Sequence, residues 1–404
     1  MRKRISEPRK GWVAACLALL SPMVWGEAAG PVTFTRDIAP ILFENCVGCH
    51  RPGEVGPMSL LSYDEARPWA KSIREAVVVQ RRMPPWHADA PRGVFKNDRR
   101  LEDAEIALID RWITQGCPKG DEADLPEAPR FVEGWQLGEP DYVLEFPPFD
   151  VPAEGPDQLA NLPFKVDLPE DRWVRAIEIR PSNRQVVHHV IAFVADRPNA
   201  GVQGWLAAWA AGAPPAVFPE QTGRLVKAGA VIVANMHYHP MGTAGRDQTR
   251  IGLYFADKPV EREVINLWVM NNQFVIPPGA GNHEVTATHT FEQDSVILSV
   301  APHMHYRGKD MLMKAVFPDG RERVLVNVPN YDFNWQTFYE PVEPIQAPKG
   351  TRIEIVAHFD NSTGNPANPD PNKTVTFGLA STDEMMIGFV DYVPVAAPEA
   401  SGGQ

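Results

Sequence analysis

Cysteine and positive charge are both scarce in this chain of 404 residues. Its four Cys all lie at or before Cys117, so the remainder must be held together by packing alone. The formal net charge of −12 argues against a nucleic-acid partner, which would need a basic face. Beyond the first thirty residues no apolar run is long enough to span a membrane, so no integral span is expected there. With 44% hydrophobic and 22% charged residues, the chain is typical of a globular protein.

The first residues have the pattern of an export signal. A basic stretch at 2–10 precedes an apolar run over 11–25, and small residues follow at 26–30. This order predicts a signal peptide over 1–28 and a bacterial periplasmic or otherwise exported protein. A retained membrane anchor is the alternative that this pattern leaves open.

The rest of the chain divides into three regions that differ in composition and residue pattern. Residues 31–117 predict helices, with Ser62 and acidic residues at two of the expected starts. Residues 118–156 are rich in proline and acidic residues and predict a linker. From 157 onward, alternating apolar runs broken by Pro-Gly and Asp-Gly predict an all-β region. Its length and motifs predict two antiparallel sandwiches, over 157–256 and 257–395.

A haem-attachment motif lies in the helical region. Cys46 and Cys49 are spaced to bond the two vinyl groups of one covalent haem c, and His50 follows to bind the iron. Met83, in a stiff Met-Pro-Pro loop after a helix, is the expected second axial ligand, since a thioether suits electron transfer. Met58 and His87 are the rival ligands. The segment resembles a class I cytochrome c domain.

Three histidine pairs and one methionine suggest metal sites in the β region. Neighbouring histidines on a strand point to opposite faces, so a shared metal would need a strand end or a bulge. Five or six imidazoles and one thioether fit two metal ions, and the soft sulfur favours copper over zinc. These residues are His188, His189, His237, His239, His303, His305 and Met385.

These motifs resemble those of the copper type II, ascorbate-dependent monooxygenases, the family of the peptidylglycine α-hydroxylating and dopamine β-monooxygenases. The resemblance implies two jelly-roll sandwiches that face each other across a solvent-filled cleft, with one copper on each. It assigns His188, His189 and His237 to an electron-relaying copper. It assigns His303, His305 and Met385 to the catalytic copper that activates O2.

The chain departs from the amidating members of that family at three positions. Ala301, Ile387 and Phe389 stand where those enzymes bind a substrate carboxylate, so a small neutral or weakly polar organic substrate is expected. The resulting hypothesis is an exported copper monooxygenase that hydroxylates a C–H bond, fed through its own haem by an unknown electron donor. The alternatives are a non-enzymatic copper-binding or electron-transfer protein, and a metal-dependent hydrolase with Glu384 as its base.

Overall fold

The computed structural model describes residues 30–195 and 204–395 of the chain. The expected signal peptide at 1–28 lies outside the described residues. Within the described ranges, no helix has the length and apolar character needed to cross a membrane.

Helices are confined to the N-terminal part of the described chain, here called the helical unit (residues 30–124). Ser62 begins one of them as expected, since its Oγ accepts a hydrogen bond from the Glu65 amide at 3.3 Å. Buried side chains such as Phe34 and Trp112 form a separate core for this unit. Its helices and helical turns are Phe34–Ile38, α1 (Ala39–Asn45), α2 (Tyr63–Ala66), Arg67–Trp69, α3 (Ala70–Ile73), Arg74–Val79, α4 (Asp103–Thr114) and Glu122–Asp124.

Part of the expected linker at 118–156 is β structure. β1 (Tyr142–Glu145) pairs with β11 (Arg250–Phe255), and β2 (Phe149–Val151) pairs with β10 (Gly245–Asp247). Leu144 and Phe146 are fully buried in the core beneath them. The first sandwich therefore begins at β1 rather than at 157, because apolar side chains between the prolines are drawn into its core.

The first β unit (residues 142–263) is a sandwich of two sheets. Side chains from both sheets, such as Ile177 and Met236, share one buried core. The first sheet has the order β1-β11-β4-β8-β12 with β7 on β4, and comprises β11 (Arg250–Phe255), β4 (Arg172–Arg180), β8 (Thr222–Val226), β12 (Arg262–Glu263) and β7 (Ala216–Val217). The second has the order β3-β9-β5-β6, and comprises β3 (Gln158–Lys165), β9 (Val231–Tyr238), β5 (Val187–Ala195) and β6 (Gly204–Ala210); β10 (Gly245–Asp247) pairs with β2.

The second β unit (residues 265–394) is also a two-sheet sandwich. In β20 (Arg352–Phe359), every second side chain is buried, which is the period-two pattern of a half-buried strand. One sheet has the order β13-β22-β16-β19, from β13 (Ile265–Met270), β22 (Ile387–Pro394), β16 (Ser295–His303) and β19 (Ile345–Ala347). The other has the order β15-β20-β17-β18, from β15 (His283–Thr290), β17 (Gly308–Val316) and β18 (Glu322–Val328); β14 (Val275–Ile276) pairs with β21 (Val375–Thr376).

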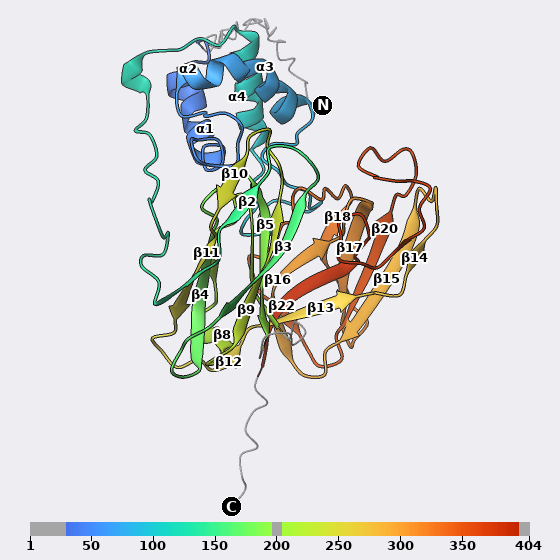
Figure 1. Cartoon of the computed structure of the whole chain (residues 1–404). Coiled ribbons are helices and arrows are strands. Elements are labelled where there is room, and N and C mark those ends of the chain that lie inside the picture. Colours follow the sequence, from blue (N-terminus) through green and yellow to red (C-terminus); the bar gives the residue numbers. More distant parts are fainter. Residues whose placement is uncertain (1–29, 196–203, 396–404) are drawn as a thin grey trace, which may run out of the picture.

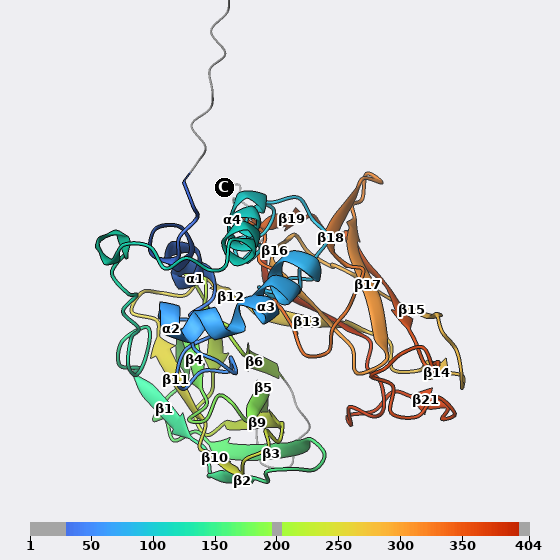
Figure 2. The same cartoon turned by 90° about the horizontal axis from the view of Figure 1, so that it is seen from above.

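The helical unit sits over one end of the two β units, which stand side by side (Figures 1 and 2). Residues 84–100, here called the strap, attach it to the second β unit. Trp86 packs against Tyr339 with ring centroids 5.1 Å apart, and Phe95 is buried in the core of that unit. Arg99 reaches the first β unit, donating from Nη2 to the Gly212 carbonyl at 2.8 Å. The strap therefore touches both sandwiches.

We predict that Trp86→Ala loosens this attachment. The variant removes the aromatic contacts with Phe95 and Tyr339 and should cost about 2 kcal/mol, because Trp86 is only partly buried. Thermal unfolding and limited proteolysis within the strap should both report it. Trp69→Ala, at an exposed tryptophan of the helical unit, is the control and should leave both unchanged. Equal changes in stability and in proteolysis for the two variants would contradict the role of Trp86 in attaching the helical unit.

Candidate metal centres

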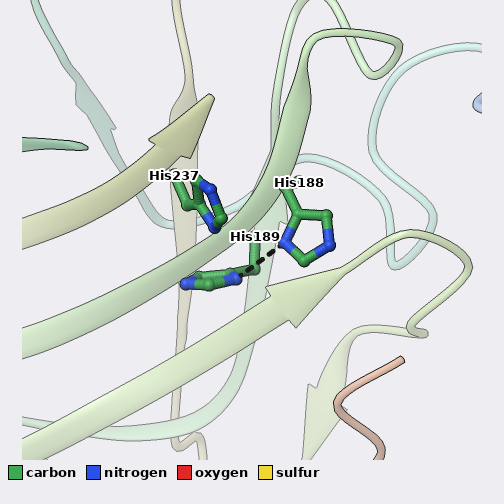
Figure 3. A group of neighbouring side chains, drawn as sticks. All are labelled: His188, His189 and His237. Carbon is green, nitrogen blue, oxygen red and sulfur yellow. Dashed lines mark hydrogen bonds between the residues drawn. The ribbon is translucent and has the colours of Figure 1, made fainter. Parts of the chain in front are cut away.

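Three histidines of the first β unit gather around one point (Figure 3). His188 and His189 come from the start of β5 and His237 from the end of β9. The β5–β9 register shifts between Val187 and His189, so a bulge falls at His188. The bulge lets two adjacent side chains turn to the same place, as the sequence required of a shared site.

The hydrogen bonds of these histidines leave suitable nitrogens facing inward. His237 Nε2 lies 2.6 Å from Asp157 Oδ2, whereas its Nδ1 is buried and has no partner. The Nδ1 atoms of His188 and His189 are 3.1 Å apart. One nitrogen from each of the three rings lies within 4.8 Å of the others. This donor set fits a copper ion, which imidazole nitrogens bind well.

Burial keeps two of the three histidines, His188 and His189, in the uncharged form that binds a metal. Burial, with a smaller contribution from His237, lowers the pKa of His188 to about 4. Burial also lowers the pKa of His189 well below its ordinary value. Protons therefore compete weakly for these nitrogens at neutral pH.

Asp157 orients this group from outside. Its two carboxylate oxygens accept from His237 Nε2 and from His239 Nδ1 at 2.6 and 2.7 Å. Burial acts to raise the pKa of Asp157, but the histidine hydrogen bonds outweigh it and hold the pKa well below its usual range. His239 is thus placed behind the site, as a partner of the carboxylate. Asp157 belongs to no motif, so no pattern in the sequence pointed to it.

A second group lies on the facing side of the second β unit. His303 ends β16 and His305 follows in the next turn, with ring centroids 5.3 Å apart. His303 Nδ1 lies 2.7 Å from Gln336 Oε1, and His305 Nδ1 lies 3.3 Å from the Asp383 carbonyl. These hydrogen bonds of both rings run through Nδ1, so Nε2 is the nitrogen of each ring that could bind a metal. Burial lowers the pKa of His303 to about 4 and that of His305 to about 3.

Met385 lies next to this second group. It is partly buried and packs against the apolar cluster of Ala301, Ile387 and Phe389. Phe389 in turn contacts His303, with ring centroids 5.8 Å apart. Two imidazoles and a thioether fit a copper ion, because sulfur is a soft ligand.

Glu384 fixes the turn that carries His305. Its carboxylate accepts from the backbone amides of His305 and Arg307 at 2.8 and 2.6 Å. Glu384 is fully buried, and burial raises its pKa to about 8 even though these hydrogen bonds oppose the shift. With both oxygens held by the backbone, Glu384 does not offer the free general base that a hydrolase would need.

Tyr331 and Gly308 complete the support of the turn. The Tyr331 hydroxyl accepts from the Met304 amide at 3.1 Å and donates to the Met304 carbonyl at 2.8 Å. A Cβ on Gly308 would come within 2.8 Å of the Tyr331 ring, so only glycine allows this close approach.

Phe333 fills the space between the two histidine groups. Its ring lies 5.6 Å from that of His188, nearly parallel to it, and 5.9 Å from that of His305. Phe333 is only 8% exposed. Tyr306 crosses beside it and donates to Asp157 at 3.1 Å. At this point of the separation that the resemblance implies, an aromatic side chain therefore lies between the two histidine groups.

A cavity of about 340 Å³ opens onto both groups, with His189 and His303 among its lining residues. Of the three residues that the sequence placed at the substrate, Ala301 and Phe389 line this cavity, whereas Ile387 packs in the same apolar cluster but is not part of the lining. Trp205 of the first β unit completes the wall. The cavity therefore has room for a small organic molecule beside the candidate metal ligands.

The expected haem ligands lie in the helical unit. Cys46 and Cys49 are free thiols, and burial raises the pKa of Cys46 to about 12. His50 Nδ1 is buried without a hydrogen-bond partner. Met83 and Met58 both pack against the core of the same unit. Two free thiols beside a buried imidazole with an unpartnered nitrogen fit covalent haem.

The structure separates His87 from this group. His87 lines a small hollow with Tyr331 and Tyr339 of the second β unit. His87 therefore lies against the second β unit, whereas Met83 packs against the helical core. Cys117 is buried in the helical core, as expected of an inert thiol.

Comparison with known protein families gives one match. Residues 261–401 match the family model described as "Copper type II ascorbate-dependent monooxygenase, C-terminal domain". The match spans the second histidine group and supports a copper-dependent oxidoreductase of the monooxygenase kind, which uses O2 and an organic substrate.

Comparisons with whole proteins add no functional information. No curated protein matches the chain. The major capsid protein P2 of bacteriophage PM2 aligns over 64% of this chain and 98% of its own, with 11% identity and a TM-score of 0.27. A Paenibacillus xanthan lyase aligns over 68% and 28%, with 9% identity and a TM-score of 0.17. Similarities this weak do not establish a shared fold.

We predict that Glu384→Gln weakens metal binding at the second histidine group alone. The amide has only one acceptor oxygen for two backbone N–H groups, so the turn around His305 should lose about 1–3 kcal/mol of support. Copper titration should then show one weakened site and one unchanged site per chain.

The control for this variant is Asp383→Asn, one residue away. The Asp383 side chain pairs with Lys373 at the surface rather than with the turn. Equal weakening in both variants, or weakening of both copper sites in Glu384→Gln, would argue against the assigned role of Glu384.

Proposed function

We propose that this chain is an exported copper-dependent monooxygenase that hydroxylates a C–H bond of a small organic substrate. We propose further that its electrons arrive through its own c-type haem. The observation that carries the proposal is a single cavity lined by His189 of one candidate copper group and His303 of the other. The family match over the second β unit supports the copper chemistry.

Copper would be held by His188, His189 and His237 at one centre and by His303, His305 and Met385 at the other. When bound, copper supplies one-electron redox chemistry and O2 activation at the second centre, and haem held by Cys46, Cys49, His50 and Met83 supplies electron transfer. Hydroxylation consumes O2, two electrons and two protons, and it releases the alcohol and water. A substrate-binding protein without this reaction would not need two ligand sets on one cavity.

The protein's own residues orient the metal ligands and exclude water from part of the site. Asp157, Gln336 and Glu384 fix the imidazoles or the backbone that carries them. Phe333 and the apolar wall around Phe389 keep water away from the space between the groups. Exclusion of water limits the loss of reactive species to solvent.

The helical unit is placed to serve as the electron donor. A Cβ on Gly212 would lie 3.0 Å from Cys49 Sγ, so the haem-attachment motif abuts a turn of the first β unit. That turn follows β6, in which Ala210 pairs with His189. Glu54 strengthens the contact through a largely buried ion pair with Arg184 at 2.6 Å. These contacts favour electron entry at the three-histidine centre.

We expect two coppers per chain, of which one has a sulfur ligand in the reduced protein. His237→Ala should lose one copper and keep the Cu–S contact, whereas Met385→Ala should lose the Cu–S contact. Metal analysis and X-ray absorption of the reduced protein measure both. Met270→Ala, at an exposed methionine of the same β unit, is the control. Zinc at both sites, or a sulfur contact that survives Met385→Ala, would refute the copper assignment.

We expect one covalent haem when the chain is expressed with cytochrome c maturation machinery. Replacing both Cys46 and Cys49 by Ala should abolish it, whereas Cys117→Ala should not. The absorbance of the denatured, haem-stained protein measures attachment. Met83→Ala should also remove the far-red sulfur-to-iron band. If Met58→Ala removes that band instead, Met58 is the axial ligand.

A further inference from the structure

We infer that the cavity between His189 and His303 selects an uncharged substrate with a flat apolar body and one neutral hydrogen-bonding group. The inference rests on the proposed function for the reaction that follows binding. The selection itself follows from how the cavity is lined, and binding can be measured without turnover.

The apolar end of the cavity is built from aromatic rings beside His303. Trp205 and Phe389 have ring centroids 4.7 Å apart, and Phe338 lies 5.8 Å from Trp205. The Phe338 and Phe389 rings are within 20° of parallel. Aromatic faces of this kind bind flat hydrocarbon surface by burial and by ring stacking.

Small side chains keep this end open. The second wall of the cavity is formed by alanines of β6 and the turn that follows it, among them Ala207, Ala208, Ala210, Ala211 and Ala213. A volume of about 340 Å³ is enough for a molecule of one or two rings. Larger side chains on β6 would close it.

Two oppositely charged side chains near the aromatic wall are paired with each other. The other charged residues of the lining are Lys96, Arg99 and Glu340, and they lie where the strap borders the cavity. Arg224 of the first β unit and Asp391 of the second face the cavity and pair at 2.6 Å. Asp391 also accepts from Asn266 at 2.7 Å and from Ser299 at 3.3 Å, and Arg224 donates to the carbonyl of Leu206. Both charges are thus already satisfied within the protein.

This pairing discriminates against ionised substrates. A carboxylate would meet Asp391 as well as Arg224, and an ammonium group would meet Arg224 as well as Asp391. Neither ion would recover the hydration that it loses on entry. A hydroxyl or carbonyl group loses less hydration free energy on entry, and it can still hydrogen-bond to Arg224 or Asp391. The cavity therefore favours a neutral alcohol, ketone or amide over an acid or an amine of the same shape.

The test compares three probes of one shape: 2-(2-naphthyl)ethanol, 2-naphthylacetate and 2-(2-naphthyl)ethylamine. Isothermal titration calorimetry is run on the full-length, metal-loaded protein in its oxidised state without reductant, so that no turnover occurs. We expect the alcohol to bind at least tenfold more tightly than either ion. Equal or tighter binding of the acid or the amine, or no binding of the alcohol, would overturn the inference.

A matched pair of variants locates the binding. Ala208→Phe fills the cavity and should abolish binding of the alcohol. Ala128→Phe adds the same bulk at an exposed position outside the cavity and should leave binding unchanged. If the alcohol still binds Ala208→Phe with unchanged affinity, it occupies another place and the inference fails.

A third variant tests the charge argument. Asp391→Asn keeps the shape of the side chain but leaves the charge of Arg224 unpaired. The affinity of the acid should therefore rise at least fivefold relative to that of the alcohol. An unchanged ratio in the folded variant would refute the assigned role of the pair. If selective binding persists but no hydroxylated product forms after reduction, the proposed function fails while this inference stands.

Discussion

The position of one buried ring, Phe333, determines how the two halves of the candidate centre relate. Each β unit has its own core, and each could hold its histidines without the other. The histidine groups share one environment because Phe333 contacts His188 on one side and His305 on the other. The hydrogen bond from Tyr306 to Asp157 and the ion pair of Arg224 with Asp391 cross between the same two units.

The shared environment has an energetic cost that metal binding offsets. Several imidazoles and the Glu384 carboxyl lie buried in one region, and burial disfavours the charged form of each. The protein keeps the imidazoles uncharged and gives the carboxyl two backbone donors. Because the buried imidazoles are uncharged, the protein can fold with their nitrogens facing inward. These nitrogens form strong bonds only when a metal ion binds.

Much of this arrangement could be predicted from the sequence, because the key signals are local. The Cys46–His50 spacing, the Ser62 cap and the need for a bulge at His188 each depend on a few neighbouring residues. The alternation in the β region predicted sandwiches because it reports burial on one face of a strand. The chain crosses between the sandwiches at Val264, a few residues beyond the expected boundary at 257.

What the sequence missed depends on contacts between distant segments. Asp157, Phe333 and Gln336 lie in irregular stretches, and nothing near them in the chain marks a partner. The same holds for Glu384, which the sequence offered only as the base of the alternative hydrolase. Its neighbours in sequence do not reveal the two amides that hold its oxygens. The strands at 142–151 were hidden by the prolines around them, Pro140, Pro147, Pro148 and Pro152, all of which lie outside the strands.

The strap has a consequence for how such a protein can evolve. Pro85, Asn97 and Arg99 of the strap line the same cavity as His189 and His303. The segment that joins the helical unit to the sandwiches thus also forms part of the cavity wall. Exchanging this unit for a different domain would change the shape of the cavity at the same time. The helical unit and the shape of the cavity are therefore inherited together, and recombination at the domain boundary would not separate them.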